Sequence, residues 1–194
     1  MFFREDLHKT NDMFSGGFKL RYSETTQPLK GEFWVRLKDK SGAILEERHG
    51  NNIIVNSASV LIARLLKDNS EPIGGITYLA MGTGAVGWNL QNPPQPTTSQ
   101  TKLENEIARK AFTTEDVTFV DPETGDPTLV PTNVLDFTAT FAETEAVGPL
   151  VEMGLFGGDA TDLLDSGTQV NYRTFPVLNK TNSMTLTIIF RITA

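Results

Sequence analysis

The side chains that most often carry acid–base and metal chemistry are few in this sequence and stand apart from one another. The 194 residues include two histidines, His8 and His49, and no cysteine. His8 lies in a polar N-terminal segment and His49 in a charged turn, and neither context favours a rigid triad or a metal site. A chain without cysteine has no disulfides, thiolate metal sites or cysteine nucleophiles. We therefore expect neither a metal site nor a cofactor.

Carboxylates are grouped more closely, and a pair of them could hydrolyse a glycosidic bond. The groups are Glu104 with Glu106, Glu143 with Glu145, and Asp159 with Asp162 and Asp165. These positions fall near predicted strand ends or in acidic loops, with few aromatic residues nearby to stack on sugar rings. Residues 121–126 repeat only the opening of a calcium-binding EF-hand loop. The expectation is solvated acidic loops and a protein that is not an enzyme.

Gly82-Thr83-Gly84 is the glycine pattern that comes closest to a phosphate-binding loop. It lacks a third glycine, a following helix and a Gly-Lys-Ser/Thr sequence, which together make such a loop. We interpret it as the turn that ends a strand.

Charge and hydropathy argue against two classes of partner. The formal net charge is -7 and the pI is about 4.9. An acidic surface repels phosphate, so no nucleic-acid partner is expected. No apolar stretch approaches the ~18 residues of a membrane helix, and residues 1–6 are charged too early for a secretory signal. We expect a soluble protein with no membrane partner.

The residues after Glu32 alternate between apolar and polar with the period of half-buried strands. A first strand over 33–38 is predicted to return over 43–47, and a further turn at 50–52 leads into 53–55. More strands are predicted at 76–81, 117–120, 134–141, 150–156, 170–178 and 184–193, and the last two flank a polar hairpin loop at 179–182. Many strands separated by turns predict a mainly antiparallel β-sandwich, with an incomplete barrel as the alternative.

One internal helix is predicted over 57–67, with Asn56 or Ser57 as its N-cap. Its apolar residues cover more than one face, so we expect the helix to be buried against a sheet. The stretch 101–110 fits either a short helix or an extended segment. Before it, residues 85–101 form a long polar loop rich in proline, of a length that is usually functional or mobile.

The N-terminal residues 1–30 form a predicted extended arm, followed by a β-sandwich domain over 31–194. The arm cannot bury enough apolar surface alone to offset its ordering entropy, yet it carries four phenylalanines that need a partner on this domain or on a neighbour. Trp88, in the long loop, either folds back on the domain or anchors a partner. Ile189 is the single apolar residue on the outer face of the last strand. The candidate interface residues are Phe2, Phe3, Phe14, Phe18, Trp88 and Ile189.

A series of short motifs runs from residue 50 towards the C-terminus. They are the segments 51–57, 61–66, 78–84, 103–109, 152–158, 173–177, 179–181 and 186–190. In the segment 103–109 a leucine, a glutamate and an arginine follow one another at intervals of three. The order of these motifs resembles that of small tail-, baseplate- or fibre-associated virion structural proteins of tailed bacteriophages. The resemblance covers about residues 50–194 and brings no catalytic residues with it.

This resemblance implies a structural subunit of the tail machinery, at the baseplate periphery, the fibre attachment or the neck and collar. Such a protein is made in the host cytoplasm, resides in the virion and acts by assembly with other virion proteins and with copies of itself. Apolar area buried between subunits and edge strands that accept a neighbour's arm would drive that assembly. A capsid decoration or cement protein is one alternative, and a carbohydrate-binding tail-tip protein is another.

Overall fold

The computed structural model describes residues 29–67 and 74–194, and strands are its predominant regular structure. In chain order the elements are β1 (Lys30–Asp39), β2 (Ile44–Ile54), α2 (Asn56–Lys67), β3 (Gly74–Gly82), β4 (Glu106–Ala111), the 3-10 turn η1 (Thr114–Asp116), β5 (Val117–Val120), β6 (Pro127–Thr128), β7 (Val134–Phe141), β8 (Gly148–Gly158), β9 (Thr168–Gln169), β10 (Asn171–Lys180) and β11 (Met184–Thr193).

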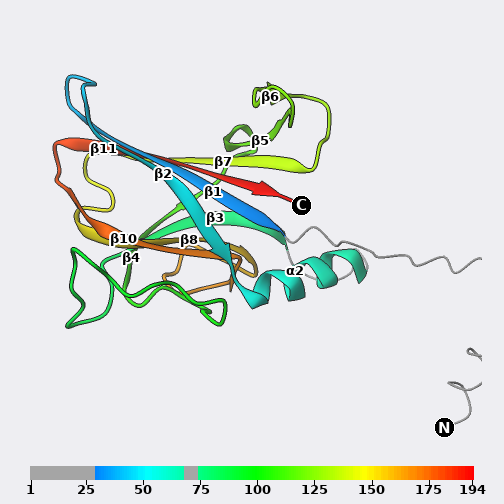
Figure 1. Cartoon of the computed structure of the whole chain (residues 1–194), viewed down its shortest axis with the longest axis horizontal. Helices are drawn as coiled ribbons and strands as arrows, with labels where there is room; N and C mark the ends of the chain where they lie inside the picture. The colour runs from blue at the N-terminus through cyan, green and yellow to red at the C-terminus, as the bar shows by residue number, and fades with distance from the viewer. Residues whose placement is uncertain (1–28, 68–73) are drawn as a thin grey trace, which may run out of the picture.

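The strands form one antiparallel sheet that is folded over into two layers (Figure 1). We call the strands in the order β2-β1-β11-β7-β5-β6 the β1 layer, and those in the order β4-β3-β8-β10, with β9 beside β8, the β8 layer. Strand β2 joins them, because its Ile53 and Ile54 leave β1 and pair with β10. Among the described residues, the two edge strands β4 and β6 do not pair, so the sheet is not closed. The predicted mainly antiparallel β-sandwich or partial barrel is thus confirmed.

The core lies between the two layers and is built by the alternation that the sequence shows. In the β1 layer, Phe33 pairs with Phe190 and Leu37 with Leu186 across the β1–β11 ladder, and these side chains are buried. The β8 layer contributes its own inward row, which includes Leu79, Met81, Met153, Leu155 and Leu178. Burying an apolar side chain of this size contributes roughly 1.5–3 kcal/mol. The packed rows therefore fix the register of both layers.

Helix α2 is less buried than the sequence predicts. Ala58 and Leu61 are buried, whereas Val60, Leu65 and Leu66 are 59%, 45% and 80% exposed. The first half of the helix packs on β3 and β9, while its second half projects beyond the ends of the strands (Figure 1). An apolar stripe on a helix is covered only where another element reaches it.

The strand pairing also corrects two local predictions and decides between the two alternatives for residues 101–110. Strand β2 continues through the expected turn at 50–52, because residues 50–52 pair with β1 before the strand passes to the other layer. The stretch 101–110 ends in strand β4 rather than a helix. Strands β10 and β11 do not form a hairpin, because β10 pairs with β8 and β11 with β1 and β7.

The predicted division into an arm over 1–30 and a domain over 31–194 stays a prediction. Residues 1–28 lie outside the described residues, and Phe2, Phe3, Phe14 and Phe18 with them. In the part of the chain that is described, no helix is long and apolar enough to span a bilayer.

Candidate interaction surfaces

The outer face of the β8 layer is covered by its own chain. Residues 83–105, which we call the covering loop, lie against it and enclose a second apolar cluster that includes Ala80, Leu103 and Phe156. The loop is held along its length by backbone atoms. Thr98 O accepts from Asn56 N at 2.8 Å, and Pro94 O accepts from Thr174 Oγ1 at 2.7 Å. The predicted long loop at 85–101 is therefore fixed on its own domain.

Both ends of the covering loop are anchored on one carboxylate, that of Glu152 in β8. Glu152 is fully buried and accepts hydrogen bonds from Gly84 N at 3.0 Å and from Glu104 N and Asn105 N, both at 2.9 Å. Tyr172 Oη donates a fourth, at 2.7 Å. A buried carboxylate without a counter-ion is stable when its lone pairs are filled in this way.

The four donors occupy both oxygens of Glu152, which accounts for this carboxylate as a structural anchor of the loop. Burial and the adjacent Glu152 charge and hydrogen bond raise the pKa of Tyr172 well above its ordinary value. The hydroxyl of Tyr172 thus stays protonated and remains a donor. The Gly82-Thr83-Gly84 turn is explained here too: Gly84 has a φ of 73° and presents its N–H to Glu152.

A second buried group fixes the loop 159–167 to the same face. Arg109 pairs with Glu106 in two hydrogen bonds of 2.5 and 2.8 Å, and their side chains are 3% and 0% exposed. The guanidinium also donates to Thr161 O at 2.7 Å and to Ser166 Oγ at 2.6 Å. The leucine–glutamate–arginine motif of 103–109 is therefore a buried structural device, since Leu103 is buried as well.

Trp88 lies against the domain and is half-buried. A Cβ added to Gly84 would come within 2.5 Å of the Trp88 ring and within 2.8 Å of Val151, so the indole covers this glycine closely. Of the two alternatives predicted for Trp88, the structure shows the first, in which the side chain folds back on its own domain. Its role in an interface stays a prediction.

Two of the acidic residues considered for catalysis, Glu106 and Glu145, are held in separate ion pairs. Glu145 binds Lys110 Nζ through both oxygens at 2.9 Å, and that hydrogen bond, with another from Ala142 N, lowers the pKa of Glu145. Glu106 binds Arg109, which holds the loop 159–167, and Glu152 anchors the covering loop. Within 29–67 and 74–194, no three histidine or acidic side chains converge in a way that could hold a metal ion.

The outer face of the β1 layer, in contrast, leaves a group of large side chains partly exposed, and the loop between β5 and β6 reaches it at Gly125, whose carbonyl oxygen accepts from Arg191 Nη2 at 3.4 Å. We define this exposed patch by Trp34, His49, Asp136, Ile189 and Arg191. The Trp34 ring stacks on His49 with a centroid distance of 4.6 Å, and the Arg191 guanidinium lies 5.2 Å from the Trp34 ring centroid. Ile189 is opposite Trp34 in the β1–β11 register, as the predicted outward position requires.

The charged side chains in and beside the exposed patch are paired. Arg191 binds Asp136 at 2.7 and 2.8 Å, which raises the pKa of Arg191. Arg36 binds Glu47 at 2.5 Å. A shallow cavity of about 330 Å³ lies among Trp34, Arg36, Glu47 and Ile189. The indole is flanked by imidazole and guanidinium, so its rings are poorly placed to stack on a sugar.

Sequence reasoning found Ile189 but missed the rest of the exposed patch. The missing information was the register, which places Trp34 between His49 and Ile189. The alternation after Glu32 did assign Trp34 to the outer face of its strand. The signal that could have revealed the patch was the presence of outward aromatic or basic residues on strands that pair.

Comparison with known proteins places the chain among phage structural proteins. Residues 52–147, about half of the chain, match the family model described as "Baseplate wedge 3 tail fiber network component". The match runs from the end of β2 to the turn before β8 and includes the covering loop and the Glu106–Arg109 pair. It confirms the resemblance to tail-, baseplate- and fibre-associated virion proteins. A search of curated proteins gave no match.

Proposed function

We propose that this chain, a tail-, baseplate- or fibre-associated component of the phage virion, is a non-catalytic connector in the baseplate and tail fibre network. It works by holding neighbouring virion proteins, and copies of itself, in a symmetric assembly. The description of the matching family favours the tail machinery over the capsid alternative.

The observation that carries this proposal is the difference between the two outer faces. The β8 layer is covered by its own loops, whereas the β1 layer leaves Trp34, Ile189 and Arg191 only partly buried. Tryptophan and arginine are enriched among the residues that dominate binding energy at protein interfaces. We place the principal contact with a neighbouring virion protein on the exposed patch.

The charges around the patch supply specificity. Arg36 with Glu47 and Arg191 with Asp136 are already paired, so a partner meets a nearly neutral rim around an apolar and aromatic centre. Burial of that centre drives association at ~25 cal/mol per Å² before the entropic costs of binding. Polar rim groups then select the orientation of the partner.

A double substitution tests the proposal: Trp34→Ser with Ile189→Ser. The variant is supplied in trans during assembly of particles that lack the wild-type protein, and its copy number in purified virions is measured by mass spectrometry. We expect incorporation to fall at least tenfold, because the apolar centre of the contact is removed.

The matched control is Leu129→Ser with Val130→Ser, which removes two exposed apolar side chains outside the patch, and we expect normal incorporation for it. Circular dichroism and the unfolding midpoint establish that both variants are folded. Normal incorporation of the folded Trp34/Ile189 variant would refute the patch as the contact, and turnover of any polysaccharide by the wild-type protein would refute the non-catalytic role.

A further inference from the structure

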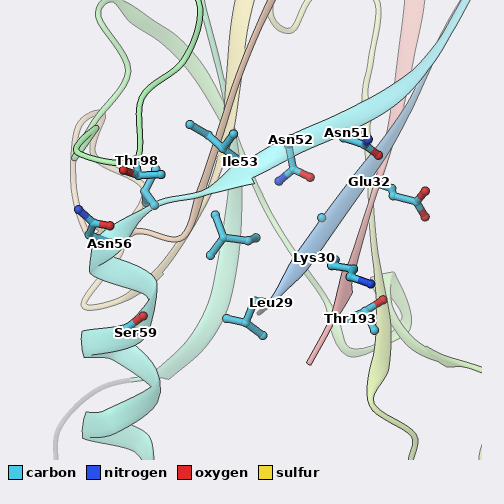
Figure 2. Close-up of a pocket in the computed structure, with 13 residues that line it drawn as sticks. Leu29, Lys30, Glu32, Asn51, Asn52, Ile53, Asn56, Ser59, Thr98 and Thr193 are labelled. Atoms are coloured by element: carbon cyan, nitrogen blue, oxygen red, sulfur yellow. The ribbon is translucent and has the colours of Figure 1, made fainter. Parts of the chain in front are cut away.

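A groove opens at the corner where β2 leaves the β1 layer and crosses to the β8 layer (Figure 2). The last β1–β2 pair is Gly31 with Asn52, after which Ile53 and Ile54 pair with β10. The resulting wedge between β1 and α2, which we call the corner groove, has a cavity volume of about 740 Å³. Its lining includes Leu29, Asn52, Ile53, Val55, Ser59 and Thr98.

An unpartnered amide lies in the wall of this groove. Asn52 is only 7% exposed, and neither its Oδ1 nor its Nδ2 has a hydrogen-bond partner among the described residues. The side chain occupies the space above Gly31, where a methyl group would collide with it. A buried amide that lacks hydrogen-bond partners lowers the stability of the fold by about 1–3 kcal/mol. Its donor and acceptor together complement one peptide group, which also offers one of each.

The corner groove continues along α2 as an apolar line. Ser59 lines the groove, and Ile62 and Leu66 follow it at positions three and seven residues later, on the same side of the helix. Ile62 is 38% exposed and Leu66 is 80% exposed. The combined surface thus offers a polar contact suited to backbone and then an apolar contact suited to large side chains.

We propose that the corner groove and this line on α2 are the docking site for residues 14–28 of the same chain. That segment runs directly into Leu29, which lines the groove and packs against the main core. A short tether gives the segment a high effective concentration at the site. The segment carries Phe14 and Phe18, spaced four residues apart.

The reach of the segment fits the dimensions of the site. Phe18 stands eleven residues before Leu29, a span of at most about 40 Å of extended chain. Helix α2 has 12 residues and is therefore about 18 Å long. Docking leaves the exposed patch of the β1 layer free, so this inference is independent of the proposed function.

The absence of cysteine from the chain allows a direct test by labelling. Ser59→Cys places a single thiol in the wall of the groove, and its reaction rate with a maleimide is measured in the full-length protein. Adding Phe14→Ser with Phe18→Ser is expected to increase that rate at least fivefold, because the segment no longer covers the thiol. The matched control is Phe2→Ser with Phe3→Ser, which is expected to leave the rate unchanged.

A second thiol position separates local uncovering from loss of folding. Leu129→Cys lies at a fully exposed position away from the groove, and its rate is expected to be the same in all variants. Equal Ser59→Cys rates with and without Phe14 and Phe18 would overturn the proposal. Protection that disappears on dilution would overturn it too, because it would show that the occupant comes from a second copy or another protein.

Discussion

The outer face of the β8 layer is covered by loops, whereas the outer face of the β1 layer is touched by a loop at Gly125, which accepts from Arg191, and leaves Trp34 and Ile189 partly exposed. Two groups of buried charge hold the loops on the β8 layer: Glu152 with its four donors, and Glu106 with Arg109. On the β1 layer the corresponding pair, Arg191 with Asp136, is partly exposed, and the guanidinium lies over the Trp34 ring. Burial of charge without complete pairing is costly, so the complete pairing on the β8 layer indicates a structural role.

Three ion pairs of the chain form a graded series that makes this difference measurable. The side chains of Arg109 and Glu106 are 3% and 0% exposed, those of Arg191 and Asp136 are 22% and 15% exposed, and those of Lys110 and Glu145 are 37% and 40% exposed. Arg109 and Arg191 both bind a carboxylate through two nitrogens and both lie over aromatic rings. The two arginines differ in their exposure to water and in the further hydrogen bonds that Arg109 donates to Thr161 and Ser166.

The largest effect is expected for Glu152→Ala. The substitution leaves the N–H groups of Gly84, Glu104 and Asn105 and the hydroxyl of Tyr172 without their acceptor. We expect the free energy of unfolding to fall by on the order of 4 kcal/mol, measured by urea titration. Glu123→Ala, at an exposed acid, is the control and is expected to change it by less than about 0.5 kcal/mol. A loss below about 1 kcal/mol for Glu152→Ala would contradict the anchoring role.

The second-largest effect is expected for Arg109→Ala. It should lower the free energy of unfolding by roughly 3 kcal/mol, because it leaves the Glu106 charge buried and unpaired. Limited proteolysis is expected to cut within 159–167, since Thr161 and Ser166 lose the guanidinium donor. The double variant Glu106→Gln with Arg109→Met should recover at least half of the lost stability, because no unpaired charge remains. A double variant as unstable as Arg109→Ala would show that packing, and not charge, determines the cost.

The strands of both layers were predictable from the sequence because alternation is a local property. Strand β11 spans the predicted residues, and the inward row of Leu186, Ile188 and Phe190 is buried as its pattern indicates. The same alternation places Ile189 on the outer face. A residue's side of a strand is thus set by its immediate neighbours in the sequence.

The anchors of the covering loop were not predictable in this way, because their partners are far apart in the sequence. Glu152 meets Gly84 across 68 residues and Asn105 across 47. Nothing in the vicinity of Glu152 distinguishes it from a solvated acid. The exposure of α2 was missed for a related reason: whether an apolar stripe is covered depends on where the other elements end.

Arg191→Ala is the substitution on the exposed patch that corresponds to Arg109→Ala. We expect it to lower the free energy of unfolding by about 1 kcal/mol. Water partly screens the Arg191–Asp136 pair, and the contact of the guanidinium with Trp34 adds a small term. The thermal unfolding midpoint of this variant is compared with that of Arg109→Ala under the same conditions. If Arg191→Ala were as destabilising as Arg109→Ala, the exposed patch would have to be regarded as a structural element rather than a free surface.

The smallest effect is expected for the most exposed pair, Lys110 with Glu145. The hydrogen bond from Lys110 holds the pKa of Glu145 below its ordinary 4.5. A carboxyl group with a lowered pKa stabilises the fold above its ordinary pKa, and this contribution is lost as the pH falls through the lowered value. Solvent screening limits it to about 0.5 kcal/mol. Lys110→Met should therefore reduce stability slightly at pH 7 and hardly at all at pH 2.5, as measured by urea titration at both values. A difference that is larger at pH 2.5 would have the wrong sign for this pair and would place the stabilising contact elsewhere.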